Sequence, residues 1–171
     1  MRLDAARAVE QMGGREVILL LRLKARVGDK DPRITGQLLE ALLQLEGNAA
    51  ILFVGEFLET HDEEVAEEAA LALGASRLAE GVALLRQKWE KWQGMRPGIA
   101  LLRGISVSRL DEAIEFLIDL VTRGRERDAE DALDALGLQK GSEEIVQRVE
   151  KAVEERGDDA LRGIFQRRFL L

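Results

Sequence analysis

The sequence predicts an all-α fold in which pairs of helices stack one after another along the chain. Three observations carry this prediction. Leu, Ala, Glu and Arg, which favour helices, dominate the 171 residues, and the β-branched or aromatic runs that strands need are absent. Only two prolines, Pro32 and Pro97, interrupt the chain. Similar strings of small and apolar residues also recur at a spacing of roughly thirty residues, which is typical of repeat proteins.

Five similar strings define the repeat, and we interpret each as the end of the first helix of a pair. They cover residues 8–13, 41–47, 70–74, 99–104 and 132–137. Each string ends at a glycine, namely Gly13, Gly47, Gly74, Gly104 and Gly137. Because glycine tolerates the left-handed conformation that closes many helices, we expect each of these glycines to be the residue just after a helix.

A second amphipathic helix follows each string, and a polar break then starts the next pair. We predict these second helices at residues 15–26, 48–61, 78–92, 110–122 and 142–156. The chain 1–171 is then one domain, with units of approximately 1–30, 31–61, 62–94, 95–124 and 125–157 and a closing helix at 158–171. Since one pair cannot bury its apolar face alone, the pairs must stack into an α-solenoid.

The spacing of apolar residues fixes the buried face of several helices. The third unit carries Leu78, Val82, Leu85, Trp89 and Trp92 at helical spacing, and the fourth carries Leu110, Ile114, Leu117 and Val121. In the second unit Ile51, Phe53, Val54, Phe57 and Leu58 cover a wider arc, which indicates a helix packed on several sides. The closing helix places Leu161, Ile164, Phe165 and Phe169 on one face.

Residues 62–74 resemble the first helix of the bacterial HEAT repeats first named from phycobilisome lyases. The opening Asp62, the following Val65, the Ala-Ala pair and the final Ala-Leu-Gly stand in the usual order. Residues 128–137 are a looser match, and the resemblance covers roughly residues 3–157 as five units. In the fourth unit Pro97 and Gly98 replace the usual start, so we expect its first helix to be short or kinked.

The resemblance implies a scaffold. Members of the family mostly bind proteins along the concave surface of the solenoid, and a minority are lyase chaperones or DNA-modifying enzymes. The primary expectation is therefore a non-catalytic protein–protein interaction scaffold that needs no cofactor. A lyase-type chaperone or enzyme that handles a chromophore or small ligand is the alternative that the resemblance also implies.

No constellation of residues with a clear catalytic pattern is found. His61, the only histidine, could pair with Asp62 as a general base, but we interpret it as a residue complementing a helix dipole beside an Asp that caps the next helix. The acidic residues 62–64 are interpreted as the solvated start of that helix. With no cysteine and one histidine, a zinc site is not expected.

A second alternative is nucleic-acid binding through the stretch from Arg86 to Arg109. This stretch holds six basic residues against Glu90 alone, together with two tryptophans that could stack on bases. However, Trp89 and Trp92 continue an apolar stripe, so we expect burial, at least for Trp89. A net charge of −7 also argues against general affinity for phosphates.

The remaining expectations concern location. The longest apolar run, residues 49–54, is too short to cross a bilayer, and the charged N-terminus lacks a secretory signal, so we expect a cytoplasmic protein. The terminal helices carry no polar flank. We therefore expect either a piece of a longer repeat protein or self-association through uncapped terminal helices.

We predict that the partner, a protein with an extended surface of mixed charge, binds the outward residues of the second helices. These lie opposite the apolar stripes and form a surface that is basic at the first unit and acidic toward the last. The predicted binding residues are Arg22, Arg26, Glu56, Thr60, Gln87, Lys91, Glu115, Asp119, Glu150 and Glu154.

The helical phase of the third unit generates a testable prediction. Replacing Leu85 by Ala should lower the free energy of unfolding by about 2–5 kcal/mol, because it opens a cavity between helices. Urea denaturation of the two proteins measures the difference. A loss below about 0.5 kcal/mol, the range of ordinary surface substitutions, would mean that Leu85 is not on the buried face.

Overall fold

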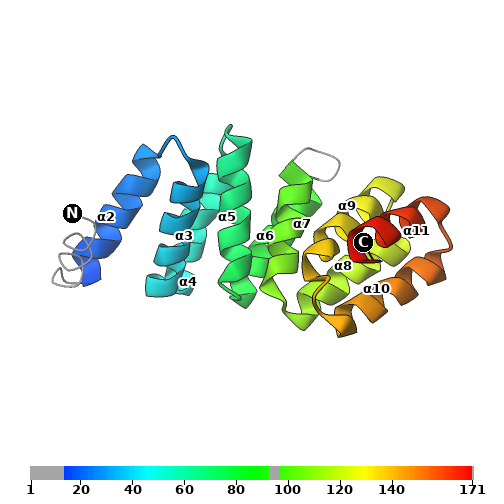
Figure 1. The fold of residues 1–171 in the computed structure, drawn as a ribbon. Coiled ribbons are helices and arrows are strands. Elements are labelled where there is room, and N and C mark those ends of the chain that lie inside the picture. Colours follow the sequence, from blue (N-terminus) through cyan, green and yellow to red (C-terminus); the bar gives the residue numbers. More distant parts are fainter. Residues whose placement is uncertain (1–13, 93–96, 171) are drawn as a thin grey trace.

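The computed structural model describes residues 14–92 and 97–170, and this part of the chain is helical without any strand (Figure 1). The all-α prediction is confirmed. The α-helices are α2 (Gly14–Val27), α3 (Pro32–Glu46), α4 (Asn48–Glu56), α5 (Glu63–Ala75), α6 (Ala79–Lys91), α7 (Pro97–Ser108), α8 (Asp111–Arg123), α9 (Glu126–Leu136), α10 (Glu143–Arg156) and α11 (Asp159–Phe165). Short turns η1 (Phe57–Glu59) and η2 (Gly137–Gln139) are 3₁₀, and η3 (Gln166–Leu170) is a π-helical turn.

The predicted second helices agree with α2, α4, α6, α8 and α10 to within a few residues. The main difference is in the second unit, where α4 gives way to the turn η1 at Phe57. The helix expected before Gly13 lies outside the described residues. In the fourth unit α7 begins at Pro97 and has 12 residues, between the 13 of α5 and the 11 of α9, so the helix expected to be short there has an ordinary length.

The helices succeed one another along the length of the molecule (Figure 1). Odd-numbered helices pack against each other in chain order, from α3 through α5, α7 and α9 to α11. Among the even-numbered helices, α4 packs against α6 and α8 against α10. Consecutive helices also contact each other, as α6 and α7 do. We call these groups the odd-numbered set and the even-numbered set.

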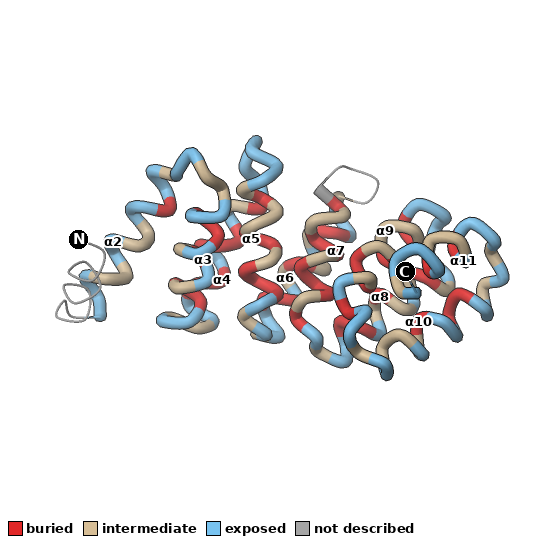
Figure 2. Tube along the Cα trace, viewed as in Figure 1, coloured by how far each residue is buried: buried red, intermediate tan, exposed pale blue. Residues whose placement is uncertain are grey.

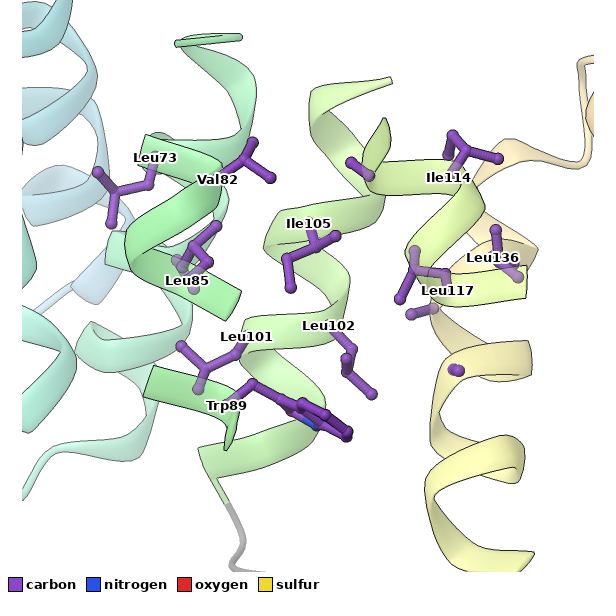
Figure 3. Packing of buried hydrophobic residues seen from close by; sticks show 14 of the residues in the cluster. Leu73, Val82, Leu85, Trp89, Leu101, Leu102, Ile105, Ile114, Leu117 and Leu136 are labelled. Carbon is purple, nitrogen blue, oxygen red and sulfur yellow. The ribbon is translucent and has the colours of Figure 1, made fainter. Parts of the chain in front are cut away.

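A continuous apolar core runs between the two sets (Figure 2). Figure 3 shows its central part, where side chains from α5, α6, α7, α8 and α9 meet. Leu85 and Leu117 are fully buried, and Trp89 is 4% exposed and meets the ring of Phe116 edge-on at 5.4 Å between centroids. The predicted helical phase of the third and fourth units is thereby confirmed. Leu78 and Leu110, at the starts of those stripes, are only partly buried.

The two helices of a pair are joined by the same kind of short turn in two cases, α5 with α6 and α7 with α8. Between α5 and α6, the Ser76 hydroxyl donates to the carbonyl of Leu73 (2.6 Å) and accepts from the amide of Leu78 (3.3 Å), while Arg77 takes a positive φ of 54°. Residues 108–110 repeat this Ser-Arg-Leu sequence between α7 and α8, with both hydrogen bonds and an Arg φ of 55°. Two of the connections between consecutive helices therefore share both sequence and local structure.

The glycines at the ends of the repeated strings do not all close helices. Gly47 does, with a positive φ of 57°. Gly74 and Gly104, in contrast, lie inside α5 and α7, so the prediction was wrong for these two. Gly137 directly follows α9, as predicted, but it has a right-handed φ of −56° and begins η2. Gly13 lies outside the described residues.

Gly74 and Gly104 are required by contact between two helix backbones. A Cβ atom added at Gly74 would overlap the carbonyl oxygen of Gly104, and one added at Gly104 would overlap the carbonyl oxygen of Ala70. Helices α5 and α7 consequently meet without intervening side chains, and theirs is the most extensive helix contact in the described structure. Glycine is the residue that permits such close approach.

Replacing Gly104 by Ala should destabilise the protein by about 3 kcal/mol, the upper part of the range for overpacking, because the obstacle is backbone that cannot change rotamer. Helix propensity alone would make the Ala variant about 1 kcal/mol more stable, so a loss of stability would show that the backbone contact outweighs propensity. Urea denaturation measures it. Gly141→Ala, where a Cβ meets nothing within 4 Å, is the control and should stay within about 0.5 kcal/mol of the wild type.

Candidate interaction surfaces

The ten binding residues predicted from the sequence all come from the even-numbered part of the stack. Arg22 and Arg26 lie on α2, Glu56 on α4, Thr60 just after η1, Gln87 and Lys91 on α6, Glu115 and Asp119 on α8, and Glu150 and Glu154 on α10. Nine are exposed, and Arg22 is half-buried. Their predicted outward direction agrees with this exposure, whereas their role in binding stays a prediction.

Several of these charges are already paired within the chain. Arg26 on α2 binds Glu56 on α4 at 2.7 Å, and Glu115 on α8 binds Arg148 on α10. Asp119 pairs with Arg123 one turn along α8 at 2.8 Å. The gradient expected from the sequence is therefore weakened, because charges from neighbouring helices neutralise one another.

Arginines of the even-numbered helices also pack on aromatic rings of the next helix in that set. The guanidinium carbons of Arg22 and Arg26 lie 4.7 and 5.0 Å from the ring centroid of Phe53, and Arg86 lies 4.5 Å from that of Phe116. Such cation–π contacts contribute about 0.5–1 kcal/mol each at exposed sites. These cations therefore help hold the helices together.

The aromatic residues of the basic stretch are largely enclosed. Trp89 is buried, as predicted, so its faces are closed to a nucleic-acid base. Trp92 is half-buried, and the amine of Lys88 lies 5.3 Å from its ring centroid. Lys88 also pairs with Glu59. Arg96, another of the six basic residues between Arg86 and Arg109, lies outside the described residues.

The region around His61 has the geometry of a helix start. His61 is exposed, and Asp62 accepts hydrogen bonds from the amides of Glu64 (3.1 Å) and Val65 (3.2 Å). Asp62 is thus the helix cap that the sequence predicted. Within the described residues, no group of three or more His, Cys, Asp or Glu side chains could hold a metal ion.

A charged cluster that sequence reasoning missed lies on the odd-numbered set. Arg103 of α7 donates to Glu67 of α5 at 2.7 Å and to Asp134 of α9 at 3.3 Å. Asp134 is also paired with Arg168 of η3. Four elements far apart in sequence therefore meet at one line of ion pairs, which we call the Arg103 bridge.

Two open hollows flank the Arg103 bridge, with volumes of about 400 and 550 Å³. Both are lined by Arg103, Asp134, Arg167 and Arg168. The first adds mainly Glu67, Leu71, Leu138 and Lys140, and the second adds Ile99, Glu130, Asp131 and Ile164. The surface thus combines apolar walls with charges of both signs.

The electrostatics differ between the two hollows. The Glu67 and Asp134 carboxylates raise the pKa of Arg103, which keeps it charged. In the second hollow, burial raises the pKa of Asp131. Arg167, which lines both hollows, and Lys140, which lines only the first, have no ion-pair partner among the described residues, so the first hollow carries more unpaired positive charge.

The Arg103 bridge has no local signal in the sequence. Its partners are separated by 36 and 31 residues, and each looks like an ordinary solvated residue of an amphipathic helix. Only the packing of α5, α7 and α9 brings them together.

Comparisons of the chain with protein-family models, with curated proteins and with solved structures give no match. No described helix is both long and apolar enough to cross a membrane.

Beside the Arg103 bridge, the carboxylate of Glu68 lies against the backbone of α3 at Gly36. Burial, and then the nearby Glu67 and Glu40, raise the pKa of Glu68. A carboxyl group whose folded-state pKa is raised stabilises the fold below its unfolded pKa, and this contribution is lost as the pH rises through the folded pKa.

Glu68→Gln should therefore raise the free energy of unfolding at pH 7, because it removes an unfavourable charge. The gain should shrink as the pH falls toward about 4, because the wild-type carboxyl takes up its proton first in the folded state and then in the unfolded state. Urea denaturation at the two pH values measures the difference. A gain that is equal at both, or a loss at pH 7, would contradict the assigned environment.

Proposed function

We propose that the protein is a HEAT-like α-solenoid that acts as a non-catalytic scaffold and binds another protein. The succession of helix pairs and the two identical Ser-Arg-Leu turns support a repeat architecture. Such stacks expose an extended surface to which successive units each contribute a few residues. The resemblance of residues 62–74 to a HEAT helix points the same way.

The observation that carries the proposal is the pair of hollows beside the Arg103 bridge. Their walls come from α5, α7, α9 and η3, so a partner lying there contacts several units at once. Mixed charges with apolar residues such as Leu71 and Ile99 suit a polypeptide segment, since apolar contacts supply affinity and charges supply orientation.

We place the partner on the odd-numbered set, although the sequence favoured the even-numbered one. From α3 to α7 the odd-numbered helices pack much more closely than α4 and α6 do. A stack of pairs bends toward its closer-packed side, which favours the odd-numbered set as the inner face of this half. Toward the C-terminus α8 and α10 pack more closely than α9 and α11 do, so there the proposal rests on the hollows themselves. In addition, Arg26, Glu56 and Glu115 of the even-numbered set are occupied by ion pairs within the chain, whereas the hollows beside the Arg103 bridge also offer the unpaired Lys140 and Arg167.

Charge reversal distinguishes the two surfaces. Lys140→Glu with Arg167→Glu alters the first hollow and, through Arg167, also the second, whereas Lys91→Glu with Lys151→Glu makes the same change of charge on exposed residues of α6 and α10. Partners captured from cell extract with the wild-type chain are identified by mass spectrometry. Binding of the purified partner is then measured for both variants at low and high salt.

We expect the hollow variant to bind at least about tenfold more weakly, chiefly through slower association at low salt, and the control to bind normally. Both variants should unfold like the wild type, because all four residues are exposed. Loss of binding only in the α6 and α10 variant would move the partner to the even-numbered set. Normal binding by both variants would contradict a role for the hollow.

A further inference from the structure

The two hollows beside the Arg103 bridge differ in the charge that their linings carry. Among the described residues, four cations and two carboxylates line the first hollow, whereas three of each line the second. The bridge pairs Arg103 and Arg168 with Glu67 and Asp134, all four of which line the first hollow. The first hollow therefore keeps an excess of positive charge in a chain whose net charge is −7.

This excess comes from Lys140, which directly follows η2, and Arg167, which lies on η3. Both side chains are exposed, and neither has a hydrogen-bond or ion-pair partner among the described residues. An ammonium group carries three N–H donors and a guanidinium group five. The first hollow therefore offers free donors and positive charge to an anionic group.

Apolar side chains stand beside these cations. Leu138 is 50% exposed and lines the first hollow together with the half-buried Leu71. A peptide with a carboxylate next to an apolar side chain matches this lining, because the apolar contact supplies affinity and the charge supplies orientation. A small inorganic anion would leave the apolar wall uncovered.

The second hollow limits how far an acidic segment can extend. Glu130 and Asp131 of α9 line the second hollow, and neither has an ion-pair partner among the described residues. Their carboxylates would repel further acidic side chains, and equally the successive phosphates of a nucleic acid. A short acidic segment gains from the first hollow alone, whereas a long polyanion would also meet this repulsion.

The cation on η3 is held in place before any partner arrives. Helix α11 packs against α9, and η3 continues directly from α11 (Figure 1). Arg168, the neighbour of Arg167, is paired with Asp134 of α9. Because this pair anchors η3, a partner that binds Arg167 does not have to order the backbone that carries it.

We propose that the first hollow binds a short acidic segment of the partner protein. A carboxylate of the segment lies between Lys140 and Arg167, and an adjacent apolar side chain packs on Leu71 and Leu138. Recognition of acidic motifs by clustered cations is a common mode of peptide binding. This inference rests on the function proposed above and adds the chemistry of the partner.

A random peptide library displayed on phage and selected on the immobilised full chain tests the proposal. Enriched peptides should carry Asp or Glu next to a large apolar residue. Fluorescence anisotropy then measures how a labelled synthetic peptide from this set binds to single variants. Lys140→Glu alters only the first hollow, whereas Lys151→Glu makes the same change on an exposed residue of α10.

Lys140→Glu should bind the acidic peptide about five- to tenfold more weakly, because one charge pair changes from attraction to repulsion, and Lys151→Glu should bind it normally. A second peptide, with its acidic residue replaced by Lys, should prefer Lys140→Glu to the wild type. Leu138→Gln, which removes an exposed apolar side chain, should weaken binding of the acidic peptide. Thermal unfolding checks that the variants fold.

The outcomes separate this inference from the proposed function. Enriched peptides that lose binding to Leu138→Gln but are indifferent to Lys140→Glu would overturn the acidic segment and leave protein binding at the hollow intact. No enrichment, or peptides indifferent to both changes, would overturn both. A labelled single-stranded oligonucleotide that binds more tightly than the peptide, with the same dependence on Lys140, would overturn the peptide in favour of nucleic acid.

Discussion

The contact between the backbones of α5 and α7 at Gly74 and Gly104 constrains the rest of the structure. Most helices in proteins are held apart by side chains that can adjust their rotamers. Here a backbone carbonyl group of each helix occupies the space that a side chain would need at the glycine of the other helix. The separation and register of these two helices are therefore set by direct contact between their backbones. Helices α6 and α8 follow α5 and α7 through identical short turns, and so inherit their positions.

The Arg103 bridge depends directly on this contact. Arg103 is the neighbour of Gly104 in sequence, and Glu67 lies on α5 two turns before Gly74. Fixing the register of the two helices thus fixes how far the guanidinium is from the carboxylate, and a hydrogen bond of 2.7 Å results. A site assembled from separate helices needs this kind of support, because a shift of one ångström would separate its charged groups.

The sequence predicted the helices well and the contacts between them poorly. Helical phase follows from which residues are apolar, so the burial of Leu85, Leu117 and Trp89 could be inferred from spacing alone. A glycine near the end of an apolar string, in contrast, reads identically whether it closes a helix, as Gly47 does, or receives another backbone, as Gly74 does. Likewise, nothing near Arg103 in sequence identifies Glu67 and Asp134 as its partners, because packing alone joins them.

The Gly74–Gly104 contact also bears on how a repeat protein of the kind proposed here could change length during evolution. Stacks of similar helix pairs can grow or shrink by gaining or losing a pair wherever the joint between neighbours is generic. The contact between α5 and α7 is specific, since each helix has a glycine whose missing side chain leaves room for the backbone of the other. A helix pair inserted there would need glycines at matching positions to form such contacts on both of its sides. Duplication or loss is therefore more readily tolerated toward the ends, leaving the centre as an indivisible segment.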